Sequence, residues 1–114
     1  MPFSYQIASE LSLDYPPNLG PGEWAPFICG MLGAKEYVNP VAGKYLFDTS
    51  EFEEHGISLY LSEFLEFKYL TKPYVYEPNL SILDVMMWNS PTDIVSAIKQ
   101  GTTLIQLTDA KQVA

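Results

Sequence analysis

Hydrophobic positions recur with helical spacing near the start of the chain. Residues 22–32 carry large apolar side chains at intervals of three and four, which predicts a helix entered at Glu23. Pro26 falls in the first turn, where a proline is tolerated, and Gly33 is placed to end the helix. The apolar positions of this helix are Trp24, Phe27, Ile28, Met31 and Leu32. An earlier stretch, residues 5–12, is expected to form a shorter helix.

The middle of the chain combines a short capped helix with strand patterns. Asp48 is followed three positions later by Glu51, which predicts a helix from Asp48 through Glu54 that stops at Gly56. Apolar and polar residues alternate over 57–61, as in a half-buried strand. Shorter strands are expected at residues 36–38 and, within an aromatic region, at residues 74–76.

Two further helices are predicted near the C-terminus. The first covers residues 80–88. The second begins with the strongest local signal of the chain, because Ser90 can cap it, Pro91 suits its first position and Asp93 completes the capping pattern. It should run to Gln100 and end at Gly101, followed by a strand over residues 103–107. About four helices interleaved with short strands indicate a small α/β fold, expected as one domain over residues 1–114.

The charge of the chain is strongly acidic and excludes several classes of partner. Six lysines and no arginine stand against 14 acidic residues, a net charge of −8. Isolated lysines cannot neutralise a run of phosphates, so nucleic acid is not an expected partner, and neither is an anionic membrane surface. The sequence contains no long apolar segment and no positively charged leader, so we expect a cytoplasmic protein.

Single residues with reactive side chains have simple structural interpretations. Cys29 lies among apolar neighbours and is expected to be a buried, inert thiol that forms no intrachain disulfide. His55 precedes the helix-ending Gly56, where a cap is more common than a catalyst. Glu51, Glu53 and Glu54 resemble a solvated helix face. No spacing typical of metal ligands occurs, so neither a metal nor another cofactor is expected.

Asp84 is the leading site candidate, because an acid within an apolar helix must be solvated, paired or neutralised. The simpler interpretation places it at the third helical position, where it closes a capping pair with Ser81. The functional interpretation places Ser81, Asp84 and Trp88 on one helical face that lines a pocket. The complete set of candidate pocket residues is Tyr74, Tyr76, Asn79, Ser81, Asp84 and Trp88.

An aromatic band precedes this helix. Its members are Tyr60, Phe64, Phe67, Tyr69, Tyr74 and Tyr76. Such residues supply core and interface area in most proteins, because tyrosine combines an apolar body with a polar tip. Stacking on a sugar ring is the alternative, and the irregular stretch after Pro73 is a setting in which binding loops occur.

A series of short motifs resembles the C-terminal half of the WbqC-like protein family. The motifs, in chain order, are Leu11-Ser12-Leu13-Asp14-Tyr15, Gly20-Pro21-Gly22-Glu23, Ile28 through Tyr37, Gly43-Lys44-Tyr45-Leu46-Phe47-Asp48 with Phe52, His55-Gly56-Ile57, and Pro78 through Asp84. Each is weak alone, but the ordered series covers residues 8–95. The resemblance begins near the middle of the family pattern, so we expect a stand-alone half-domain, such as a mobile-cassette product, or one part of a two-chain assembly.

The resemblance associates the chain with bacterial surface polysaccharide and O-antigen synthesis. The missing half of the pattern would leave an apolar face uncovered, so we expect a non-catalytic accessory module that forms a homo-oligomer or docks on a partner protein. The alternative function implied by the resemblance is a transferase that moves an amino acid or acyl group to a sugar. In that case Asp84 and nearby tyrosines would line a site for a sugar or nucleotide-sugar.

Overall fold

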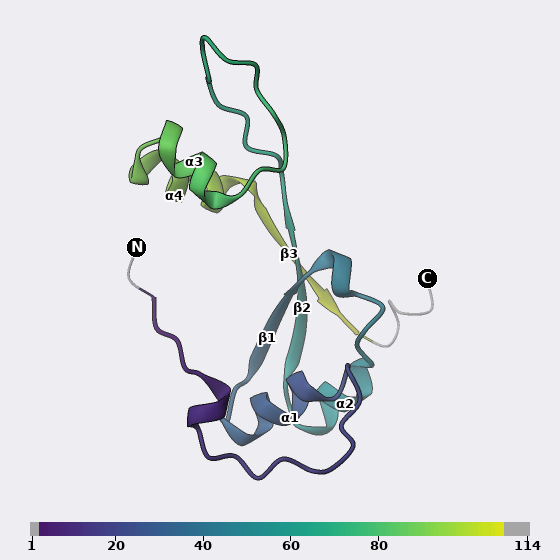
Figure 1. The fold of residues 1–114 in the computed structure, drawn as a ribbon. Helices are drawn as coiled ribbons and strands as arrows, with labels where there is room; N and C mark the ends of the chain where they lie inside the picture. The colour runs from purple at the N-terminus through teal and green to yellow at the C-terminus, as the bar shows by residue number, and fades with distance from the viewer. Residues whose placement is uncertain (1–2, 109–114) are drawn as a thin grey trace. The chain divides into compact units, whose positions relative to one another are not determined.

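The computed structural model describes residues 3–108, which divide into two compact units. We call residues 3–62 with 104–108 the core unit, and residues 63–103 the aromatic unit. The elements of the core unit are the 3-10 helix Ala8–Glu10, α1 (Trp24–Met31), β1 (Glu36–Pro40), the 3-10 helix Val41–Gly43 and α2 (Thr49–Glu54). The aromatic unit contains α3 (Ile82–Trp88) and α4 (Pro91–Gly101), while β2 (Ser58–Phe64) and β3 (Thr102–Leu107) each begin in one unit and end in the other. Figure 1 shows these elements.

The three strands form one sheet in the order β1-β2-β3. β1 and β2 are parallel, with Glu36 opposite Ser58 and Pro40 opposite Ser62. Parallel neighbours need a crossover, and residues 41–57 supply it through α2. The described residues therefore form a small α/β protein with four α-helices, which confirms the predicted fold class.

The hydrophobic core lies between the sheet and its helices in the core unit. Phe47, Phe52, Ile57 and Leu59 form a buried cluster, with Phe52 fully buried. The ring of Tyr37 on β1 stacks on that of Phe52, with centroids 5.5 Å apart. Aromatic rings in offset and edge-on contact add stabilisation beyond the area they bury, so this cluster holds α2 against β1 and β2.

The buried face of α1 differs from the predicted apolar stripe. Ala25 and Cys29, one helical turn apart, pack against the core cluster, whereas Trp24 and Met31 remain 42% and 52% exposed. The helical period was predicted correctly, but the face in contact with the core is occupied by small side chains. Small side chains let the helix axis approach the aromatic cluster closely, and Trp24 and Met31 are left at the surface.

The helix ends follow the local signals in the sequence. Gly33 and Gly56 adopt φ values of +67° and +66°, and each closes a Schellman motif after α1 and α2. The Asp48 carboxylate accepts a hydrogen bond from the Ser50 N–H at 3.0 Å. The Ser90 Oγ accepts from the Asp93 N–H at 3.2 Å and donates to the Asp93 carboxylate at 2.7 Å. The predicted caps of α2 and α4 are therefore confirmed.

Two predicted elements are wrong. The helix expected over residues 5–12 is a single 3-10 turn, Ala8–Glu10, because no residue of this turn is buried and packing does not extend it. Residues 74–76 form no strand; this stretch lies in an irregular loop that runs from Leu65 to Ser81. Beta-propensity alone does not make a strand when no neighbouring strand pairs with it.

Candidate functional site

The centre of the candidate site is a hydrogen bond between Tyr69 and Asp84. Asp84 occupies the third position of α3, and its carboxylate accepts a hydrogen bond from the Tyr69 hydroxyl at 2.5 Å. Ser81 caps α3 independently, through its Oγ and the Leu83 N–H at 3.2 Å. The Asp84 carboxylate therefore does not close the predicted capping pair with Ser81. It binds the hydroxyl of Tyr69 in the loop from Leu65 to Ser81 instead. Asp84 joins two segments of the aromatic unit that are 15 positions apart in the chain.

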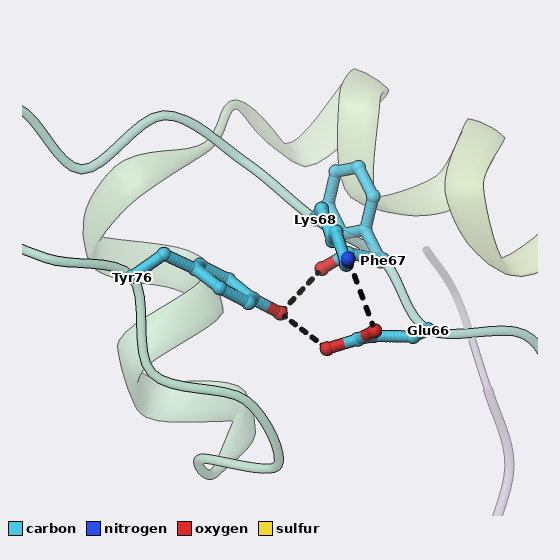
Figure 2. Close-up of polar contacts among 4 residues, drawn as sticks. All are labelled: Glu66, Phe67, Lys68 and Tyr76. Carbon is cyan, nitrogen blue, oxygen red and sulfur yellow. Dashed lines mark hydrogen bonds and ion pairs between the residues drawn. The ribbon is translucent and has the colours of Figure 1, made fainter.

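A second tyrosine lies edge-on against the first. The rings of Tyr69 and Tyr76 have centroids 5.3 Å apart at an interplanar angle of 88°. The Tyr76 hydroxyl lies 3.3 Å from both the Glu66 carboxylate and the Phe67 carbonyl oxygen, which accept from it (Figure 2). Figure 2 also shows the Lys68 ammonium beside the same Glu66 carboxylate, at 3.8 Å. One carboxylate therefore faces both a neutral hydroxyl and a cation.

Several of these side chains line a partly open cavity of about 240 Å³ within the aromatic unit. Its lining residues are Phe64, Glu66, Phe67, Tyr69, Tyr76, Asn79, Leu80 and Val85. Four of the eight are aromatic, and Glu66 is the charged member. We refer to this space as the aromatic cavity.

A wider, open groove of about 680 Å³ lies in the same unit. One side is formed by the loop residues 65–70, and the other by Trp88 with residues of α4. Asn89, Asp93, Ser96 and Gln100 contribute polar side chains to it. Tyr69 lines both the groove and the aromatic cavity, so its ring is shared by the two spaces.

The structure distributes the six candidate pocket residues over different surroundings. Tyr76 and Asn79 line the aromatic cavity, and Asn79 has a φ of +58°, which asparagine tolerates. Trp88 lines the groove, and its ring makes an edge contact with Tyr74 at 6.2 Å. Ser81 and Asp84 line neither space; Asp84 acts on the cavity through Tyr69.

Two residues at the centre of the site were not among the predicted candidates. In the sequence, Tyr69 stands out only as a member of the aromatic band, and no sequence pattern points to Glu66 as a site residue. The hydroxyl of Tyr69 and the carboxylate of Glu66 gain their importance from partners in distant parts of the loop and helix. The sequence contains one indication of this contact: Asp84 is an acid among apolar helical residues. Such an acid needs a hydroxyl or a cation close to it in the folded protein.

Both tyrosine hydroxyls are held in their neutral form. The hydrogen bond to Asp84, with desolvation and the negative charge of Asp84 as smaller causes, raises the pKa of Tyr69 to about 12. Desolvation, followed by the charge of Glu66 and the hydrogen bond to it, raises the pKa of Tyr76. Each hydroxyl therefore remains a hydrogen-bond donor at neutral pH, and neither is poised as a base.

The reactive side chains of the core unit, His55 and Cys29, take part in the local structure. His55 ends α2, and its Nδ1 lies 2.8 Å from the Glu51 carbonyl oxygen. Cys29 is half-buried against the core rather than fully buried, and burial raises the pKa of its thiol. Within residues 3–108, no group of three or more His, Cys, Asp or Glu side chains is arranged to hold a metal ion. None of the helices described is long and apolar enough to cross a membrane.

The fold and site define a small α/β protein with an aromatic cavity beside an open groove. The model of the WbqC-like protein family matches residues 2–96, which is most of the chain. This chain therefore belongs to the WbqC-like protein family. Comparisons with curated proteins and with solved structures gave no match.

Proposed function

We propose that this protein is a non-catalytic accessory module that associates with a second copy of itself through α3. One observation carries the proposal: the aromatic unit contains no buried hydrophobic residue, and Thr71 is its only buried residue. By contrast, four apolar side chains of α3 are exposed to solvent. Their exposed fractions are 56% for Ile82, 69% for Leu83, 59% for Met86 and 83% for Met87. We call these four side chains the α3 patch.

The size of the α3 patch favours a reversible dimer. Complete burial of one such side chain is worth about 1.5–3 kcal/mol, so covering the exposed parts of all four gains about 4–8 kcal/mol on each copy. Association costs about 4–15 kcal/mol in lost freedom. The balance supports a complex that forms with increasing protein concentration and separates on dilution.

The α3 patch is compatible with a second copy as the occupant, although the chain as a whole is acidic. The net charge of −8 makes two chains repel each other at long range. The α3 patch itself is uncharged, and the one acid of α3, Asp84, is half-buried and engaged by Tyr69. The same patch on two molecules can therefore meet about a twofold axis without opposed carboxylates in contact.

Sedimentation velocity over a concentration series tests this proposal. The wild-type chain should shift from monomer toward dimer as concentration rises, and added salt should strengthen the dimer by screening the repulsion between acidic copies. Met87→Glu should keep the chain monomeric, whereas Thr92→Glu, which adds the same charge at an exposed position of α4, should not. A monomer at every concentration and salt level would overturn the proposal. A basic partner protein would instead bind more weakly in salt.

A second candidate function is favoured by the groove beside Trp88. The WbqC-like resemblance implies amino acid or acyl transfer to a sugar in surface polysaccharide synthesis. An exposed indole next to amide and hydroxyl side chains is a suitable wall for a sugar ring. A thermal-shift panel of nucleotide-sugars and amino acids tests it, with Trp88→Ala as the variant that should lose any shift. An unchanged melting temperature with every compound would count against this function.

A further inference from the structure

We propose that the aromatic cavity is a binding site for a small organic ammonium ion. The inference concerns a ligand site within the aromatic unit and does not depend on self-association through the α3 patch. Three features of the cavity support it: its aromatic walls, the carboxylates at the hydroxyl ends of two tyrosines, and the position of the nearest lysine.

The walls of the cavity present aromatic rings from different directions. Tyr76 stands edge-on to Tyr69, and the Phe67 ring is tilted at 52° to that of Tyr69 with centroids 5.5 Å apart. Phe64 contributes a fourth ring. These rings contact one another, and the parts of their faces that remain uncovered in the cavity can attract a cation, because the face of an aromatic ring is negative. Walls of this kind are typical of sites that recognise alkylated ammonium groups.

Carboxylates add a negative charge that neutral aromatic walls lack. Glu66 lines the cavity and accepts a hydrogen bond from the Tyr76 hydroxyl, while Asp84 accepts a hydrogen bond from the Tyr69 hydroxyl. A phenol that donates to a carboxylate has a more electron-rich ring, which strengthens its attraction for a cation. No lysine is among the lining residues of the cavity. A cation entering this space would therefore meet attractive groups and no cationic wall.

Lys68 shows that the Glu66 carboxylate already accepts an ammonium group. Its Nζ lies 3.8 Å from Glu66 Oε2 (Figure 2). Lys68 is not among the residues that line the cavity, and its side chain is 75% exposed. Exposed ion pairs of this kind contribute little and exchange readily. Lys68 would therefore compete only weakly with a ligand for the Glu66 charge, and its removal should improve ligand binding.

The cavity volume limits the class of ligand. At about 240 Å³ the space is below the roughly 300–1,000 Å³ typical of pockets for drug-sized molecules. A small ammonium ion with methyl or short alkyl substituents suits this size, because its alkyl groups contact the rings while its charge faces Glu66.

Choline and its uncharged carbon isostere, 3,3-dimethylbutan-1-ol, provide the decisive comparison. In titrations of the full chain followed by amide NMR shifts, choline should bind about fivefold or more tightly than the isostere, with shifts concentrated in residues 64–85. Glu66→Gln should weaken choline binding about two- to fivefold, and Lys68→Met should strengthen it by a similar factor. Tyr76→Leu, which removes a wall ring, should abolish the preference for choline if the amide spectrum shows that the variant is folded.

Glu77→Gln and Lys72→Met are the matched controls. Both positions are exposed and lie outside the cavity lining, and each substitution changes the net charge as its counterpart does. Neither should alter choline binding. Equal binding of choline and the isostere, or equal effects of Glu66→Gln and Glu77→Gln, would overturn the proposal, because binding would then reflect size or overall charge alone. The absence of shifts with choline would overturn it as well.

Discussion

The bond between Tyr69 and Asp84 gives the most direct prediction, because it sets the ionisation of one identifiable tyrosine. Asp84→Asn keeps the size of the side chain but removes its charge. In the native protein the pKa of Tyr69 is raised from 10.0 to about 12, with the hydrogen bond to Asp84 as its largest cause. That difference is about a hundredfold in the ionisation constant. In Asp84→Asn the pKa of Tyr69 should fall most of the way back toward 10.0.

Tyrosine labelled with ¹³C at Cζ allows the titration of each phenol to be followed by NMR. The Tyr69 signal is assigned by its loss in Tyr69→Phe. Asp93→Asn is the matched control, because Asp93 pairs with Ser90 at the start of α4 and does not contact Tyr69. The control should leave the pKa of Tyr69 unchanged. A pKa near 10 in the wild-type chain, or an unchanged pKa in Asp84→Asn, would refute the assigned bond.

The same bond predicts a change of stability at alkaline pH. The folded pKa of Tyr69 lies above its unfolded value of 10.0, so the native state holds this proton more tightly. The stabilisation is complete below pH 10 and is lost as the pH rises through about 12. As the pH rises through this range, the free energy of unfolding should therefore fall less for Asp84→Asn than for the wild-type chain. Denaturant unfolding at several pH values measures this difference.

Three further substitutions test the packing and the caps by denaturant unfolding. Phe52→Ala should lower the free energy of unfolding by about 3–5 kcal/mol, because Phe52 is fully buried in the core; a loss below about 1 kcal/mol would contradict this. Gly22→Ala should cost about 1–3 kcal/mol, because the added Cβ would overlap the Leu46 carbonyl oxygen, so an unchanged midpoint would refute the close approach. Ser90→Ala should cost about 1 kcal/mol by removing the cap of α4, and Ser90→Asp should retain most of that stability.

The aromatic site shows where sequence reasoning reached its limit. Asp84 stood out because an acid among apolar helical neighbours needs a partner, and a partner exists. That partner is Tyr69, which lies 15 positions away in the chain, in a loop without regular structure. Neither periodicity nor spacing specifies contacts across such a loop. The local capping interpretation is correct about Ser81, which caps α3, and about the position of Asp84, but it is wrong about the partner of the Asp84 carboxylate.

The sequence by itself determined where α2 and α4 begin and where α1 and α2 end. The signals at these ends act through backbone groups a few residues away, so their effect can be read from the sequence. They are Asp48, the pair Ser90 and Asp93, and the glycines at positions 33 and 56. Tertiary structure alone decided which apolar residues are covered. The apolar pattern of residues 80–88 predicted a helix correctly, yet α3 buries none of its side chains, because burial depends on what a distant segment places against a face.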